Sequence, residues 1–228
     1  MADYRYRHRT SSTLFGGDPG TWRQSHPATT FLRMGLDPSA RRFLLRWIGA
    51  NSAGWPLGVF VALLLAALLD STRFGNYACV GAGIGWGVGF AQWLAGRKWF
   101  GARSGWMWAS TIGITAPCLF ADLVPLQENW LLLPALAAVG GLLSGLMQSN
   151  ALRSRSPKAR WWVAVSAAAW LCPALLVELV VVPGRPRNAV EFVRNFGSIA
   201  LGGVVLGVLT GLALAVLLNS IEPDTHGN

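Results

Sequence analysis

A length of 228 residues would accommodate one or two soluble domains, but the composition excludes that class of protein. Hydrophobic residues make up 53% of the chain, charged residues make up 13%, and the mean hydropathy is +0.41, values typical of a multi-span membrane protein. The net charge of +9 does not indicate nucleic-acid binding, because the basic residues form short clusters between apolar segments. We interpret these clusters as determinants of topology and as contacts for anionic lipid headgroups.

The chain begins with a polar arm, residues 1–40, which is rich in proline, glycine, serine and threonine. Its apolar side chains are too few and too scattered to build a core. We therefore expect a cytoplasmic arm that docks either on the ends of the chain's own helices or on a partner subunit. The remaining chain divides into a transmembrane domain, residues 41–219, and a cytoplasmic tail, residues 220–228.

Six apolar segments are long enough to cross a membrane, which requires about 20 residues each. They cover approximately residues 43–69, 75–95, 105–123, 130–152, 161–182 and 196–218. Short loops connect them. The sequence therefore predicts an all-α polytopic membrane protein with six transmembrane helices arranged as three repeated antiparallel hairpins.

Loop charges predict the orientation of these helices. The loops after the second and fourth segments are basic, whereas the loops on the other side carry Asp70, Asp122 and Glu128. By the positive-inside rule, both termini lie in the cytoplasm. The loop of residues 183–195 carries three arginines and is the exception. We expect the protein in a bacterial inner membrane, either cytoplasmic or intracytoplasmic.

A glycine pattern recurs in the even-numbered segments, and in helical conformation it places two glycines and a third residue on one face. Glycines on one face let helix backbones approach closely in lipid, and a polar side chain adds an interhelical hydrogen bond. The three copies are Gly85, Gly89 and Gln92; Gly141, Gly145 and Gln148; and Gly207, Gly211 and Leu214, with leucine where glutamine is expected.

The odd-numbered segments repeat as well, with a polar residue four positions after a tryptophan. These residues are Asn51, Ser110 and Ser166. The interval between Gln92 and Gln148 is 56 residues, and the same interval separates Ser110 from Ser166, which indicates duplication. Counting from the basic loops places the amides and hydroxyls within about 10 Å of the cytoplasmic boundary. We therefore expect a polar ring at one level, with Ser110 as the first partner of Gln92.

The hairpin pattern carries a resemblance. Gly85, Gly89, Gln92 and Trp93, followed by a short basic loop and a second helix from Trp106, resemble a group of uncharacterised bacterial multi-pass membrane proteins built from GxxxGxxQW hairpins. The resemblance covers about residues 47–218 and implies the architecture alone, since the group has no established activity to carry over. The second copy departs from it with Ser149 in the place of Trp93.

The tryptophans near segment boundaries fit a role as interfacial anchors. These residues are Trp99, Trp106, Trp130, Trp161 and Trp162. Deeper tryptophans are interpreted as packing residues or as contacts for a partner helix or a pigment. No cofactor is predicted, and a bound lipid or pigment stays open.

The sequence contains no recognisable catalytic constellation. The three histidines lie in the terminal regions, and the three cysteines lie inside apolar segments without the spacing of a metal site. Asp122 and Glu178, also 56 residues apart, leave two interpretations open. They form a proton relay, or they face interfacial water.

These observations favour a non-enzymatic accessory or scaffold subunit of a larger membrane complex, whose partners are other membrane protein subunits and anionic lipids. An energy-transducing complex, photosynthetic or respiratory, is the expected assembly. The alternative is a small membrane transporter or channel, because internal repeats also occur in that class.

Overall fold

The computed structural model describes residues 38–69, 76–99, 102–124, 129–154, 156–180 and 188–219, and this part of the chain is helical and contains no strand. The predictions for the arm up to residue 37 and for the tail lie outside the described residues. The elements in chain order are α2 (Pro38–Leu68), α4 (Asn76–Gly96), α5 (Ser104–Leu123), α6 (Leu132–Arg153), the short 3-10 helix η2 (Pro157–Arg160), α7 (Trp161–Val180) and α8 (Ala189–Asn219).

The predicted all-helical class is confirmed, and a long helix occupies each predicted segment. Two helices begin earlier than predicted: α2 at Pro38 and α8 at Ala189. Five of the long helices are long and apolar enough to cross a membrane. The helix outside that set is α5, which carries several serine and threonine side chains and Asp122. The apolar helices identify a multi-pass membrane protein.

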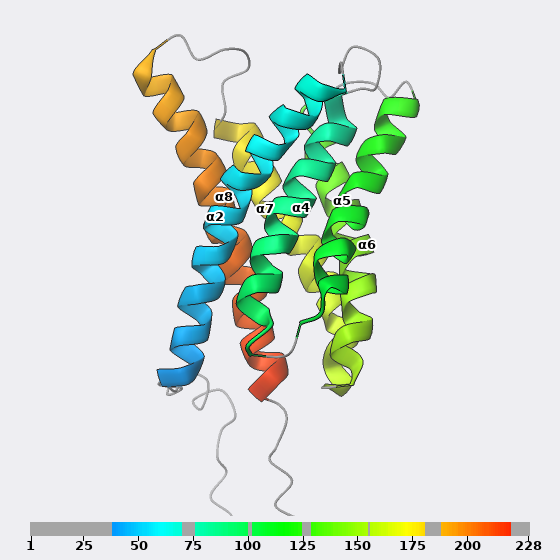
Figure 1. Cartoon of the computed structure of the whole chain (residues 1–228), viewed down its shortest axis with the longest axis vertical. Helices are drawn as coiled ribbons and strands as arrows, with labels where there is room; N and C mark the ends of the chain where they lie inside the picture. The colour runs from blue at the N-terminus through cyan, green and yellow to red at the C-terminus, as the bar shows by residue number, and fades with distance from the viewer. Residues whose placement is uncertain are drawn as a thin grey trace, which may run out of the picture. The chain divides into compact units, whose positions relative to one another are not determined.

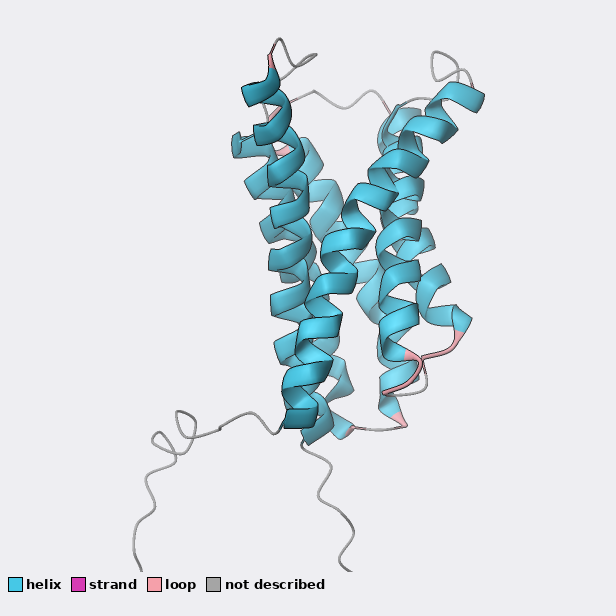
Figure 2. Ribbon diagram, turned by 60° about the vertical axis from the view of Figure 1, so that its left-hand side comes forward, coloured by secondary structure: helices cyan, strands magenta, loops and turns pink. Residues whose placement is uncertain are grey.

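The six long helices form a closed ring. Each helix packs against its neighbours in the chain, and α8 returns to pack against α2. Consecutive helices run in opposite directions, as Figures 1 and 2 show. The first and last transmembrane helices therefore lie side by side.

Glycine faces allow this close packing, most clearly on α4. Gly83 and Gly87 face α2, whereas Gly85 and Gly89 face α5. A Cβ atom added at Gly87 would lie 2.5 Å from a backbone atom of α2, and one at Gly85 would lie 2.9 Å from a backbone oxygen of α5. Neither approach leaves room for a side chain, so α4 is packed against both neighbours by bare backbone.

Tryptophan side chains from α2, α5 and α7 fill the inside of the ring. Trp47, Trp106 and Trp162 are at most 3% exposed. The ring centroids of Trp47 and Trp106 lie 6.3 Å apart, and those of Trp106 and Trp162 lie 5.6 Å apart. Two helical turns further along, Trp55 and Trp170 stack with centroids 6.2 Å apart. The core of the bundle is thus an aromatic column.

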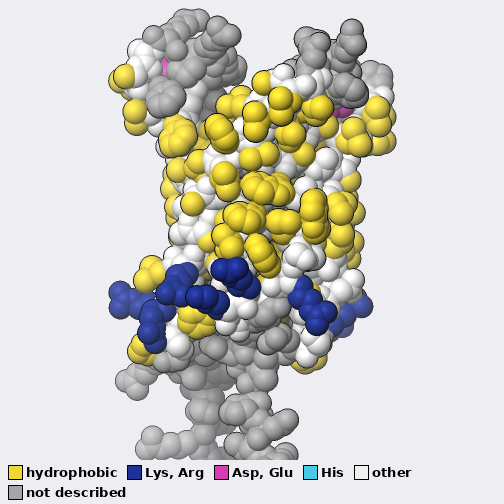
Figure 3. Space-filling model, viewed as in Figure 1, with side chains coloured by type: hydrophobic (Ala, Val, Ile, Leu, Met, Phe, Trp, Pro, Cys, Tyr) yellow, Lys and Arg dark blue, Asp and Glu magenta, His cyan; other side chains and the backbone are white. Residues whose placement is uncertain are grey.

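The two ends of the bundle differ in charge. The described lysines and arginines lie at the start of α2, α5 and α7 and at the end of α4 and α6, which is one end of the bundle, and Arg194 is the exception. Figure 3 shows this basic band below an apolar belt. The described acids, Asp122, Glu178 and Glu191, lie toward the opposite end.

Candidate functional site

The candidate site is a polar layer inside the ring, and its first unit centres on Gln92. This side chain is 3% exposed and lies between α2 and α5. Its Oε1 accepts a hydrogen bond from Trp106 Nε1 at 3.0 Å, and its Nε2 donates to Asn51 Oδ1 at 2.9 Å. Asn51 Nδ2 donates in turn to the Trp47 carbonyl oxygen at 2.8 Å. One glutamine therefore joins three helices.

Gln148 on α6 makes the same pair of bonds. Its Oε1 accepts from Trp162 Nε1 at 2.9 Å, and its Nε2 donates to Ser110 Oγ at 2.9 Å. Ser110 is therefore the partner of Gln148, and the prediction that it pairs first with Gln92 is wrong. Each glutamine donates to the helix before it in the chain and accepts from the helix after it.

The tryptophan donors were not found by sequence reasoning. Trp106 and Trp162 are buried at 3% and 1% exposure, so their predicted role as interfacial anchors is wrong. Trp99, Trp130 and Trp161 are 37%, 59% and 62% exposed, as anchors would be. Sequence spacing does not separate the two sets, because Trp161 and Trp162 are adjacent and only the helix face differs.

A threonine takes the acceptor role on the last helix. Trp47 Nε1 donates to Thr210 Oγ1 at 2.8 Å, and Thr210 Oγ1 donates to the Leu206 carbonyl oxygen at 2.6 Å. Threonine has no amide donor, so it makes no second bond like that of the glutamines. The hydroxyl of Ser166, on the preceding helix, lies 3.4 Å from that of Ser144 instead.

Glycine contacts give the register of α8 independently. A Cβ at Gly89 would meet Ser110 Cβ at 2.8 Å, one at Gly145 would meet Ser166 Cβ at 2.8 Å, and one at Gly207 would meet Asn51 Cβ at 3.1 Å. Gly207 is thus the counterpart of Gly89 and Gly145, and the third residue after it is Thr210.

The predicted third copy is consequently displaced by one helical turn. Leu214, assigned from the sequence to the glutamine position, is fully buried in the tryptophan cluster, and Gly211 packs against Trp47. The spacing of Gly203, Gly207 and Thr210 matches the repeat equally well, and this was the signal that could have revealed the correct register.

The two acids expected as a relay have separate surroundings. Asp122 accepts hydrogen bonds from the backbone N–H groups of Tyr77 and Ala78, at 3.3 and 2.7 Å, and so caps the start of α4. Glu178 is half-buried and lines an apolar pocket of about 140 Å³ beside Trp55. Within the described residues no hydrogen-bonded chain joins the two acids, and the relay stays a prediction.

No group of three or more histidine, cysteine or acidic side chains is placed to hold a metal ion within the described ranges. The layer is built from amides, hydroxyls and indole N–H groups, which join helices and do not titrate near neutral pH.

Comparisons of the chain with protein-family models, with curated proteins and with solved structures find no match, so the functional proposals rest on the residues and their geometry.

Proposed function

We propose that the protein is a non-catalytic scaffold or accessory subunit of a membrane complex, built as three repeated hairpins: α2 with α4, α5 with α6, and α7 with α8. This proposal rests on one observation: the hydrogen bonds of the polar layer are made between side chains inside the ring. The side chains of Gln92, Gln148, Asn51 and Thr210 form hydrogen bonds with one another, with Ser110 or with the tryptophans inside the ring. The layer thereby stabilises the ring and offers little polar surface to a substrate.

The aromatic column favours a scaffold over the alternative, a channel or transporter. A pore along the ring axis would need space and polar lining at the level of Trp47, Trp106 and Trp162, where the buried indole rings pack together. A second aromatic layer follows at Trp55 and Trp170. Because the inside of the ring is filled, the outer surface is the part of the molecule that would bind other subunits.

The charge distribution supports a cytoplasmic location for the basic end, and with it for both termini. The proposed setting is a bacterial inner membrane, and the proposed partners are the membrane subunits of an energy-transducing complex, photosynthetic or respiratory. This choice of partner rests on the docking arm predicted from the sequence and on the sequence pattern, which contains no recognisable catalytic constellation.

Two measurements on the full chain test the proposal. Extraction from native membranes in a mild detergent, followed by native electrophoresis, is expected to show the chain in a stoichiometric complex larger than itself. In liposomes, the purified chain is expected to give no ion flux above that of empty vesicles. A monodisperse chain without any partner would contradict the scaffold, and a specific flux would favour the channel.

A further inference from the structure

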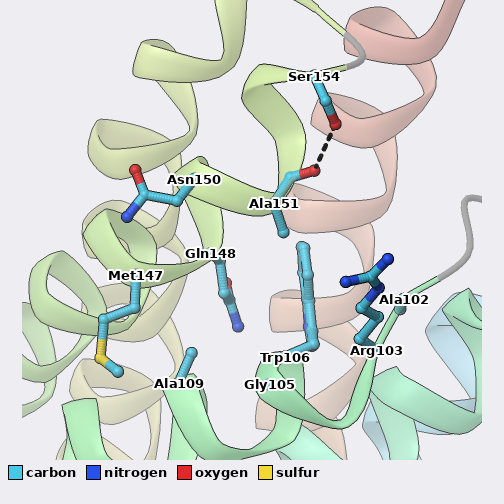
Figure 4. Close-up of a pocket in the computed structure, with 10 residues that line it drawn as sticks. All are labelled: Ala102, Arg103, Gly105, Trp106, Ala109, Met147, Gln148, Asn150, Ala151 and Ser154. Atoms are coloured by element: carbon cyan, nitrogen blue, oxygen red, sulfur yellow. Dashed lines mark hydrogen bonds between the residues drawn. The ribbon is translucent and has the colours of Figure 1, made fainter.

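The second hairpin contains a groove at the basic end of the bundle, between the start of α5 and the end of α6. Its volume is about 570 Å³, within the range of sites that hold organic ligands. Figure 4 shows Arg103 and Asn150 on opposite sides of the groove, with Trp106 and Gln148 between them. Trp106 donates to Gln92, and Gln148 bonds Ser110 and Trp162, so hydrogen bonds of the polar layer hold both residues at the floor of the groove.

Arg103 lines the groove and gives it a positive charge. The Arg103 side chain makes no hydrogen bond or ion pair with any other described residue, and the described acids lie toward the opposite end of the bundle. The side chains of Asn150 and Ser154 add polar groups to the lining, and both residues are exposed. This set suits an anionic oxygen-rich group such as a phosphodiester.

The groove is followed by apolar side chains on the side away from the basic end. Met147 lines it and is 42% exposed. Ile112, 51% exposed, lies two turns beyond Gly105 on the same side of α5, and Leu143 lies one turn before Met147 on α6. A charged head at Arg103 would therefore continue into hydrocarbon along Ile112 and Leu143, the order of groups in a phospholipid.

The first hairpin has a groove at the corresponding place, with a different lining. It measures about 440 Å³ between α2 and α4, and Leu94 and Arg46 stand where the second hairpin has Asn150 and Gly105. Glycine at residue 105 leaves the second groove open beside its arginine, because a Cβ there would meet nothing within 4 Å. The two hairpins share a backbone arrangement, and their side chains make the second groove the more polar one.

We propose that the groove between α5 and α6 binds one anionic phospholipid, with its phosphodiester at Arg103 and its acyl chains along Ile112 and Leu143. The site does not depend on the proposed scaffold function, since it is formed within one chain. Its test needs no partner subunit, so failure of the lipid site and failure of the scaffold proposal are distinguishable.

Native mass spectrometry of the full chain in mild detergent, titrated with phosphatidylglycerol or with phosphatidylcholine of the same acyl chains, tests the site. We expect one phosphatidylglycerol to be retained about fivefold more tightly than phosphatidylcholine, and Arg103→Gln to remove this preference. Gly105→Leu, which fills the groove, is expected to weaken both lipids. Arg103 makes no side-chain cap to α5, so its replacement leaves the helix start intact.

Two matched variants serve as controls. Gly49→Leu adds the same side chain at an exposed glycine whose Cβ would also meet nothing within 4 Å, and Arg160→Gln removes a charge at the same end outside the groove. Both should bind like the parent chain. Equal binding of the two lipids, phosphatidylglycerol binding unchanged by Arg103→Gln, or displacement of the lipid by millimolar inorganic phosphate would overturn the proposal. If Gly105→Leu lowers the melting temperature, its weaker lipid binding could come from a disturbed fold. The lipid preference of Arg103→Gln then decides whether the proposal holds.

Discussion

Glutamine suits the polar layer because its amide is both a donor and an acceptor. Gln92 and Gln148 each use the carbonyl oxygen for an indole N–H and the amide nitrogen for a side chain on the preceding helix. Leucine at either position would leave an indole N–H without its acceptor in a buried site, where an unpaired polar group is costly. Each glutamine therefore also stabilises the fold by providing the acceptor for a buried tryptophan N–H group.

The double variant Gln92→Leu with Gln148→Leu is expected to lower the free energy of unfolding by at least about 2 kcal/mol, since it removes four bonds that contribute about 0.5–2 kcal/mol each. The measurement is the melting temperature of the purified chain in detergent. Thr115→Val is the control, because the Thr115 hydroxyl donates only to the Thr111 carbonyl oxygen of its own helix. An unchanged melting temperature in the double variant would show that the layer is not structural.

The sequence predicts the depth of this layer in the membrane, but it does not predict which side chains bond to each other. Distance from the basic loops predicts how far Gln92, Ser110 and Gln148 lie along their helices, because the rise per residue is fixed. Which neighbour each side chain meets depends on the rotation and order of the packed helices. That each glutamine donates to the preceding helix and accepts from the following one depends on this packing of consecutive helices.

At the scale of elements, α8 shows how one helical turn changes the assignment of a repeat. Gly203, Gly207 and Gly211 are spaced four residues apart, so two registers fit the glycine pattern. Contact with α2 selects the register in which Thr210 accepts from Trp47 and Leu214 is buried among tryptophans. The sequence alone leaves this choice open, because both registers place small residues against a neighbour.

Two substitutions on α8 separate these registers. Thr210→Val removes the acceptor for Trp47 at nearly constant volume and is expected to destabilise the chain by about 1–2 kcal/mol. Leu214→Gln places an amide at a site with no exposed surface and is expected to cost at least as much. Both effects are measured by thermal unfolding. Stabilisation by Leu214→Gln together with a neutral Thr210→Val would restore the register predicted from the sequence.

At the scale of the whole molecule, the separation of charge predicts how the bundle sits in its membrane. The basic ends of the helices gather on one side of an apolar belt, and the described acids lie toward the other. Composition and loop charge were sufficient to predict this arrangement, because both depend on position along the helices and not on which helices touch.

Cysteine labelling of intact cells tests the orientation. Cys79 and Cys118 are buried, so Cys172→Ser removes the exposed thiol among the described cysteines. In that background, Asn129→Cys should react with a membrane-impermeant maleimide, whereas Lys158→Cys should react only after permeabilisation. The reverse pattern would place the basic end outside and contradict the cytoplasmic assignment.

The contact between α8 and α2 has a consequence for the order of synthesis. α2 and α4 can pair as soon as both have entered the membrane, but the face of α2 that carries Trp47 meets Thr210 only when the last helix arrives. Until then, the indole N–H of Trp47 lacks its native acceptor. Before α8 is synthesised, the other helices therefore form an open arc, and the contact of α8 with α2 closes the ring.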